Sequence, residues 1–372
     1  MADALQTFVA VCAGGLVTNV DPLTQSDAMS GSAVRLINME PSLEGGYRRI
    51  SGYENSYGTL PGTGKVLGLA VNGEINQGIL GCRKPSAGTN YLHWYNHYYD
   101  VALGSGEGSA FDVAESLTAV VSSGDSSATA VTGTVISKTS NAIVVDFGKL
   151  PSSVFATSNI LTGVTSAATG TVASTPTVKG WQAVTSAGSP TMTGVDVIRF
   201  ERYNWTEEIL VLTDGINPAV KYNGTNYVQI THANAPNNPQ FASSFANHLW
   251  LAGDPSEPFN VYFSSPNADT DFDPGNGAGV INIGFTVTQL KSFRNQLYVF
   301  GQNQIKRIVG DNYSNFSVES VTNDLGCVAP DTVVEFGGDI IFLGPDGVRP
   351  ISGTSRIGDV ELETVSREIQ KT

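Results

Sequence analysis

The sequence predicts an all-β protein: a β-propeller-like body with blades about 45 residues long, carrying a small inserted β-domain. Charged residues make up only 15% of the 372 residues, whereas glycine occurs 41 times. Few charges and many turn-forming residues favour short strands over long helices. A phenylalanine followed by a polar turn and an apolar strand recurs between residues 200 and 343. Its spacing of about 45 residues is typical of propeller blades.

The repeat is marked by Phe200, Phe245, Phe293 and Phe336. The strands that follow the last three read LWLAG, LYVFG and IIFLG, and such continuous apolar runs suit strands buried on both faces. A single blade cannot bury both faces, so blades are expected to stack around an axis. A β-sandwich or an open β-solenoid is the structural alternative. Hairpin turns are expected at Asn247-His248, Arg294-Asn295 and Gly337-Gly338-Asp339.

Composition divides the chain into parts. Residues 1–65 are expected to form an N-terminal extended arm with the first strands, and residues 66–103 and 191–353 to form the propeller-like body. Residues 104–190 hold almost no aromatics but much Ser, Thr, Ala, Val and Gly. This predicts an inserted small β-barrel or β-sandwich, with a disordered linker as the alternative. The C-terminal segment 354–372 could begin a further blade.

Net charge and cysteine usage narrow the class of protein. The charge is −14, from 20 basic and 34 acidic residues. Proteins that read duplex DNA normally show a basic face, so this balance argues against tight nucleic-acid binding. The negative charge is compatible with DNA that slides past the protein, although its simpler explanation is that it keeps the protein soluble. The three cysteines are isolated, which fits assembly in a reducing cytosol. Residues 7–12 do not make a secretion signal, and no membrane span is predicted.

Sequence motifs do not point to catalysis. There is no G-x-S-x-G elbow, and the four histidines have no neighbours that suggest a triad. Gly62-Thr63-Gly64-Lys65 resembles the end of a phosphate-binding loop, but valine follows where Ser or Thr is required. The sequence therefore predicts no catalytic, cofactor-binding or metal-binding residue, no cofactor and no enzyme. Carboxylate pairing is invisible in a sequence, so a propeller glycosidase stays open.

Two patterns could hold a metal but have simpler explanations. The acidic run at 269–275 (DTDFDPG) lacks the glutamate that closes a calcium loop, so a Pro-Gly turn is predicted, with a weak Ca²⁺ site as the alternative. His93 and His97 lie in an aromatic segment that favours a strand, where side chains four apart are about 13 Å from each other. The aromatic cluster is predicted to pack in a core or interface, with stacking on sugars or bases as the alternative. It comprises Tyr91, Trp94, Tyr95, Tyr98 and Tyr99.

Short motifs are spread over the chain outside the insert. Near the N-terminus they are Asp21-Pro22, Ala33-x-x-Leu36-x-Asn38, Gly45-Gly46-Tyr47 and Gly52-Tyr53. Later they are Arg202-Tyr203-Asn204, Thr213-Asp214-Gly215, Leu297-Tyr298-Val299-Phe300-Gly301, Gly326-Cys327-Val328-Ala329-Pro330 and Asp346-Gly347-Val348. These motifs resemble the tail nozzle (hub) or packaged-DNA-stabilisation proteins of short-tailed bacteriophages. The resemblance extends over most of residues 14–353, excluding the insert.

The resemblance implies a virion tail component that is assembled in the host cytoplasm. It implies a homo-oligomeric ring, usually a hexamer, around the DNA exit channel, through which packaged DNA passes without sequence-specific binding. The implied partners are portal–adaptor proteins and tail fibre or needle proteins, and no catalytic residues come with the family. Members are often longer, so either the chain is truncated after Thr372 or residues 7–12 close the ring as a final strand.

A different function remains open beside this one. A carbohydrate-binding or glycan-degrading propeller could act in receptor binding, and Trp94, Tyr95 or Trp250 would then stack on a sugar.

Overall fold

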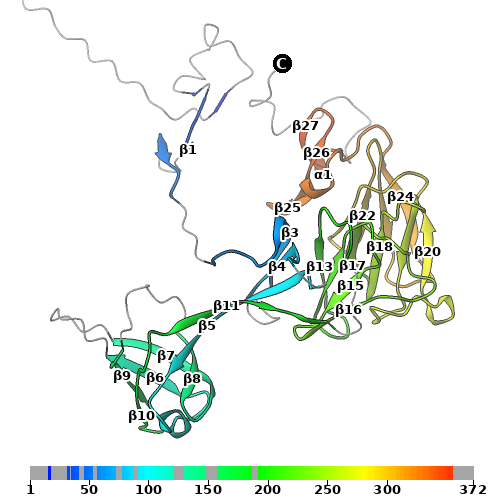
Figure 1. Cartoon of the computed structure of the whole chain (residues 1–372). Helices are drawn as coiled ribbons and strands as arrows, with labels where there is room; N and C mark the ends of the chain where they lie inside the picture. Colours follow the sequence, from blue (N-terminus) through cyan, green and yellow to red (C-terminus); the bar gives the residue numbers. More distant parts are fainter. Residues whose placement is uncertain are drawn as a thin grey trace, which may run out of the picture.

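The computed structural model describes residues 16–17, 32–33, 35–41, 46–52, 57–72, 78–86, 90–120, 130–147, 157–186 and 192–354. Antiparallel sheets dominate these residues, and the one α-helix among them is a single turn, α1 (Ile351–Thr354) (Figure 1). The predicted fold class, an all-β body of propeller-like blades with a small inserted β-domain, is confirmed. The segments 7–12 and 355–372, which were expected to close or extend the ring, lie outside the described residues.

The body is a succession of small sheets, here named blades 1 to 5 in chain order. Each blade begins with its innermost strand and continues outward through hairpins. Blade 1 comprises β3 (Thr63–Asn72), β4 (Gly78–Lys84), β5 (Leu92–Ala102) and β11 (Thr177–Ala183). Blade 2 comprises β13 (Arg199–Tyr203), β14 (Ile209–Thr213), β15 (Val220–Tyr222) and β16 (Asn226–Gln229), with the short β12 (Thr185–Ser186) parallel to β16.

The later blades repeat this plan. Blade 3 comprises β17 (Phe241–Phe245), β18 (His248–Ala252), β19 (Asn260–Phe263) and β20 (Gly279–Asn282). Blade 4 comprises β21 (Gln289–Phe293), β22 (Gln296–Phe300), β23 (Ile305–Val309) and β24 (Ser317–Thr322). In blade 5 the structure describes three strands, β25 (Val334–Phe336), β26 (Asp339–Gly344) and β27 (Gly347–Pro350), followed by α1.

Consecutive blades are held face to face by separate apolar cores. One core joins blades 1 and 2, the next joins 2 and 3, the next 3 and 4, and the last 4 and 5. The second strands of blades 2 and 3, β14 (ILVLT) and β18 (HLWLA), are buried at every residue because a blade covers each of their faces. The continuous apolar runs of the sequence are therefore the strands enclosed between blades.

Two-residue turns join the first two strands in blades 3, 4 and 5. They are Ala246-Asn247, Arg294-Asn295 and Gly337-Gly338, and both residues of each pair have positive φ. This is the backbone of a type I′ turn, whose twist matches that of a hairpin. The turns expected at Arg294-Asn295 and at Gly337-Gly338 are confirmed. The turn expected at Asn247-His248 is one residue too late, because His248 already pairs with Phe245 in the ladder.

The phenylalanine repeat needs one correction. Phe245, Phe293 and Phe336 are each the last residue of an innermost strand, directly before the turn. In blade 2 that position belongs to Tyr203, and Phe200 lies earlier in the same strand, opposite Leu212. Blade 2 has a longer loop between its first two strands than the other blades, so the similarity around Phe200 in the sequence is displaced from the structural equivalence.

The turn in blade 3 contains a strained residue that predicts a stabilising substitution. Ala246 has φ 47°, a left-handed conformation that glycine adopts without steric cost. We expect Ala246→Gly to raise the free energy of unfolding by about 0.5–1 kcal/mol, as measured by urea denaturation. Ala242→Gly, in the regular part of β17, is the matched control and should lower it by a similar amount. Equal losses in both variants would contradict the turn assignment.

The inserted domain is a small closed barrel that continues from the C-terminal end of β5. Its strands are β6 (Ser116–Val120), β7 (Ala130–Lys138), β8 (Ala142–Asp146), β9 (Ile160–Gly163) and β10 (Thr169–Thr171). The sheet order is β10-β9-β6-β7-β8-β5, and a bridge between Leu103 and Val172 closes it. The barrel has its own apolar core. Figure 1 shows it apart from the stacked blades, joined to them through β5 and β11.

The strand β11 lies within the part of the sequence that composition assigned to the insert, residues 104–190. In the structure β11 pairs with β5 over Thr177–Ala183 and so completes blade 1. Composition placed it wrongly because β11 shares the polar, small-residue character of the barrel, while its partner strand is far away in the sequence.

A short hairpin precedes the body. It consists of β1 (Met39–Pro41) and β2 (Tyr47–Arg49), which form a two-stranded sheet of their own, and we call it the arm hairpin. Figure 1 shows it away from the blades.

Candidate functional site

The most unusual feature of the body is that its series of packed blades is open between the last blade and the first. Every consecutive pair of blades shares an apolar core, but among the described residues no core contains members of both blade 5 and blade 1. Apolar side chains of the two innermost strands are exposed instead. We call this region the open seam and define it by Leu69 and Val71 of β3 and Val334 and Phe336 of β25.

The wall of the seam on blade 5 shows why these side chains are uncovered. Tyr203, Phe245 and Phe293 occupy the end of the innermost strand in blades 2, 3 and 4, and each packs in the core shared with the following blade. Their exposures are 0%, 4% and 8%. Phe336 holds the equivalent position in blade 5 but is 71% exposed. Its side chain is placed to pack on a further sheet.

The opposite wall belongs to blade 1. Leu80 and Cys82 of β4 face blade 2 and pack in the shared core. Leu69 and Val71 of β3 lie on the other face, since they pair with Gly81 and Ile79, and they are 61% and 80% exposed. On that same face Leu60 lies close to Gly81, so it covers β4 and leaves the innermost strand open.

A polar cleft of about 300 Å³ lies at the hub, where innermost strands of different blades meet. It is lined by residues of blades 1 to 4 and of the segment before β25, among them Leu69, Glu201, Lys291 and Val333. Arg199 of β13 reaches across it and donates two hydrogen bonds to the Asp331 carboxylate, at 2.6 and 2.8 Å. This bidentate pair ties blade 2 directly to the entry of blade 5.

Glu201 is the carboxyl group of the hub cleft whose pKa is shifted by burial. Burial raises the pKa of Glu201 to about 7, while the Lys291 ammonium and a hydrogen bond from the Ser244 N–H act in the opposite direction. A carboxyl with this pKa is divided between its neutral and charged forms near neutral pH. The hub therefore changes its charge near neutral pH.

This pKa predicts a pH-dependent stability. The folded pKa of Glu201 lies above the ordinary value of 4.5, so its charged form opposes folding, and this cost grows as pH rises from 4.5 and is complete above 7. We expect Glu201→Gln to raise the free energy of unfolding by about 1–2 kcal/mol at pH 8.5 and by almost nothing at pH 5. Urea denaturation at the two pH values measures this. Glu335→Gln, at an exposed position, should show no such difference between them; an identical response of both variants would contradict the burial argument.

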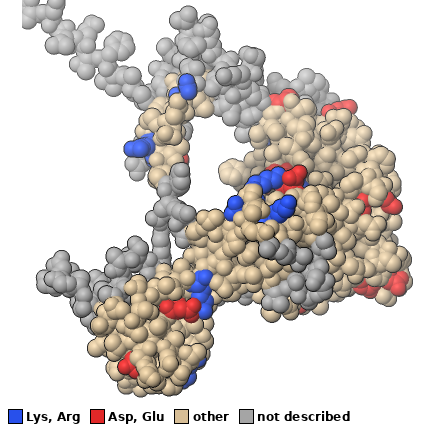
Figure 2. Space-filling view, viewed as in Figure 1, with Lys and Arg blue, Asp and Glu red and all other residues tan. Residues whose placement is uncertain are grey.

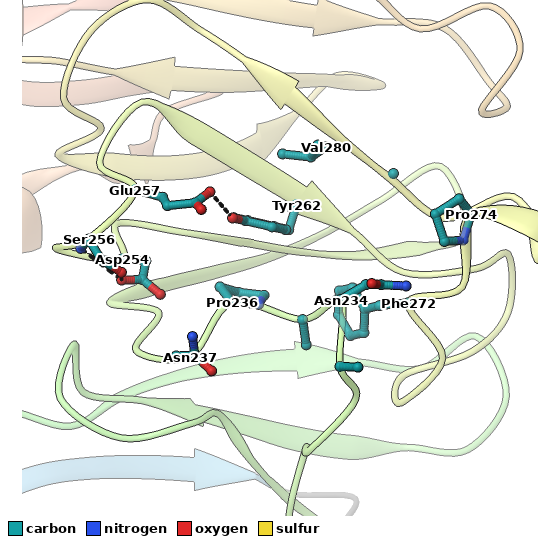
Figure 3. Close-up of a pocket in the computed structure, with 13 residues that line it drawn as sticks. Asn234, Pro236, Asn237, Asp254, Ser256, Glu257, Tyr262, Phe272, Pro274 and Val280 are labelled. Atoms are coloured by element: carbon teal, nitrogen blue, oxygen red, sulfur yellow. Dashed lines mark hydrogen bonds between the residues drawn. The ribbon is translucent and has the colours of Figure 1, made fainter.

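A second cleft, of about 340 Å³, lies on blade 3 beside the loop from blade 2 (Figure 3). The Tyr262 hydroxyl in it donates to the Glu257 carboxylate. Burial, with Glu257 beside it, raises the pKa of Tyr262 to about 12, so the hydroxyl keeps its proton. Asp254 is buried and accepts hydrogen bonds from the backbone N–H groups of Ser256 and Asn238. Its carboxylate therefore holds the two loops together.

The aromatic residues singled out in the sequence are packing residues. Tyr91 is buried and Trp94 packs against the core of blades 1 and 2, while Tyr95 is 8% exposed and contacts Tyr57 and Trp181 edge to face. Trp250 is 0% exposed. The prediction of core packing is confirmed for these side chains. Of the residues expected to stack on a sugar in the alternative function, Trp250 and Tyr95 are buried, and Trp94 is half-buried against the core of blades 1 and 2.

The other patterns have structural explanations as well. His93 and His97 lie on the strand β5, as predicted; His93 is buried and His97 lies 3.4 Å from the Asp146 carboxylate. At 269–275, the Asp273 side chain accepts from the Gly275 N–H at the start of a short 3₁₀ turn, and Asp269 pairs with Lys221. Among the described residues, no three His, Cys, Asp or Glu side chains are grouped so as to hold a metal ion. The part of the chain that the structure describes also has no helix of the length and apolarity needed to cross a membrane.

Sequence reasoning missed the residues of the seam and of the hub. Leu69 and Val71 belong to residues 66–103, which were expected in the propeller-like body, but nothing in that sequence distinguishes a covered face from an open one. Arg199 and Asp331 are far apart in the chain, and no local pattern relates them. Phe336 was found through its repeat, but the repeat did not show that its side chain is exposed.

Comparisons with known proteins add little to this geometry. No family model and no curated protein matches the chain. A chain in the crystal structure of a Nidogen/Laminin complex has a TM-score of 0.31 and 10% identity, over 64% of this chain and 90% of that one. The Phage phi92 endosialidase has a TM-score of 0.30 and 12% identity, over 74% of this chain and 50% of that one, so this chain matches half of its length. At these TM-scores neither likeness carries an argument.

Proposed function

We propose that this chain is a structural subunit of a bacteriophage tail, which forms a nozzle ring around the DNA exit channel, helps to retain packaged DNA and attaches distal tail parts. The open seam is the observation that carries the proposal. Exposed Leu69, Val71, Val334 and Phe336 lie on innermost strands, where the other blades bury the corresponding face. Contiguous exposed apolar side chains of this kind mark surfaces that a partner covers.

The charge and the modular architecture support the same function. A net charge of −14 lets DNA pass without adhering, because an acidic surface repels phosphate groups. The barrel adds a second body with its own core, joined to the blades through two strands, and such an appendage is suited to contact a neighbouring tail protein. The motifs that resemble nozzle proteins favour a hexameric ring, assembled in the host cytoplasm and carried in the virion between portal–adaptor proteins and a fibre or needle.

The proposal assigns no catalytic activity to the chain. Three carboxylates of the clefts have structural roles: Asp331 is paired with Arg199, Asp254 accepts from loop N–H groups, and Glu257 accepts from Tyr262. Glycan binding is the less favoured function, since the aromatic side chains that would have to carry it are packed in cores.

Two measurements test the proposed function. Negative-stain microscopy of the purified full chain should show rings with a central channel. Mass spectrometry of gradient-purified particles of the phage that encodes the chain should find it in a fixed ratio to the portal protein. A folded monomer that never forms rings and is absent from particles would refute the proposal.

A further inference from the structure

We propose that the arm hairpin of one copy docks in the open seam of the next copy and supplies the sheet that the seam lacks. This inference rests on the proposed self-assembly of the chain and names the contact that would produce it. Its starting point is that the molecule has two unpartnered apolar β-surfaces, one on the arm and one on the body.

The arm hairpin cannot be stable by itself. It is a sheet of two three-residue strands, β1 and β2, and two-stranded hairpins of this size are marginal in water unless another element covers one face. Its apolar side chains are uncovered: Ile37 is 59% exposed, Met39 43% and Ile50 50%. The hairpin therefore needs a partner surface to keep its structure.

The two faces of the hairpin differ, which decides how it would dock. Met39 lies opposite Arg49 on one face, and Tyr47 follows on that same side. On the other face Glu40 and Arg48 form an ion pair at 2.7 Å, and Ile50, two residues after Arg48, lies on that same side. The Met39 face is accordingly the one that can be buried, while the ion-paired face remains in solvent.

The charges of the arm hairpin and of blade 5 favour contact between these two surfaces. The arm sequence carries Arg35, Arg48 and Arg49 against Glu40 and Glu44. The strands of blade 5 carry Glu335, Asp339 and Asp346 against Arg349, whose guanidinium is already paired with Asp346. Figure 2 shows Lys and Arg side chains on the arm, and both basic and acidic side chains on the body. The basic arm is attracted to the acidic strands of blade 5, whereas β3 and β4 of the opposite wall carry Lys65, Arg83 and Lys84.

The geometry also fits ring formation. Arm and seam are different surfaces of one chain, so their contact is head-to-tail, and head-to-tail contacts generate closed rings when the rotation allows it. A hairpin docked beside β25 with its Met39 face toward blade 5 would cover Phe336. It would thus provide Phe336 with the neighbouring sheet that Phe245 and Phe293 already have.

Cross-linking between differently tagged copies tests this contact. One copy carries Met39→Cys and the other Phe336→Cys, both with Cys12→Ser; Cys82 and Cys327 are buried and stay unchanged. We expect a short bis-maleimide to produce a covalent species that contains both tags. Glu40→Cys, on the opposite face of the hairpin, is the matched control and should give at least tenfold less product with the Phe336→Cys copy.

The other outcomes separate this inference from the proposed function. Rings that persist without any Met39–Phe336 cross-link would overturn the arm contact and leave the proposed function standing. In a separate chain that carries both Met39→Cys and Phe336→Cys, a cross-link formed only within that chain would mean that the arm folds onto its own seam, which also overturns the inference. As a second variant, Met39→Asp should weaken self-association at least tenfold while the thermal unfolding of the blades is unchanged; unaltered association would contradict the inference.

Discussion

Replacing Trp250 by alanine is expected to lower the free energy of unfolding by about 3–5 kcal/mol, the usual loss for a large aromatic side chain in a core. Trp250 lies on β18 and is 0% exposed. Its ring contacts Phe245, Phe263 and Phe316, so one side chain joins blades 3 and 4. Its indole N–H donates to the Phe245 carbonyl oxygen at 2.9 Å, and truncation would leave that buried group without its donor.

Trp205 provides the control for this prediction. It is 44% exposed, in the loop between β13 and β14, and its indole N–H donates to the Ser244 hydroxyl. Trp205→Ala should cost less than about 1 kcal/mol, as expected for an exposed site. Urea unfolding followed by far-ultraviolet circular dichroism gives both values. Equal and small losses would show that blades 3 and 4 are not packed through Trp250.

Excision of the barrel should leave the blades folded. We expect a chain in which residues 101–176 are replaced by Asn-Gly to keep the thermal unfolding of the body and to lose only the heat absorbed by the barrel. Asp100 and Thr177 are directly opposite each other in the β5–β11 ladder, so a two-residue turn can join them. The barrel core shares no residue with the cores between blades, which are thus left complete.

Differential scanning calorimetry of the purified chain without the barrel checks this result. As a matched control, the same Asn-Gly turn placed between Tyr95 and Trp181 would remove most of the hairpin and should destabilise blade 1, because Tyr95 packs on Trp181 there. An excised chain that is unfolded at 25 °C would mean that the barrel holds blade 1 in place.

The local parts of the fold could be predicted from the sequence. The strands LWLAG, LYVFG and IIFLG and the turns at Arg294-Asn295 and Gly337-Gly338 follow from apolar runs and from residues that tolerate positive φ. The repeat failed at Phe200, since the longer loop of blade 2 moves the equivalent position to Tyr203. The sequence similarity around Phe200 did not reveal that the loop between the first two strands of blade 2 is longer than in the other blades.

The candidate site could not be predicted in the same way, because it depends on which sheets are neighbours. Phe336 and Phe293 have similar local sequences, yet one is exposed and the other is buried, and only the presence of a following blade distinguishes them. The pairing of β5 with β11 and the bond between Arg199 and Asp331 are likewise contacts between distant segments. Such contacts leave no local pattern in a single sequence.

Sedimentation velocity of the full chain beside Phe336→Asp tests most directly whether the exposed faces of blades 1 and 5 serve assembly. At micromolar concentration the unmodified protein should sediment as one closed multimer, and the variant as a folded monomer with an unchanged circular dichroism spectrum. Two identical monomer boundaries, or two identical multimers, would contradict the account.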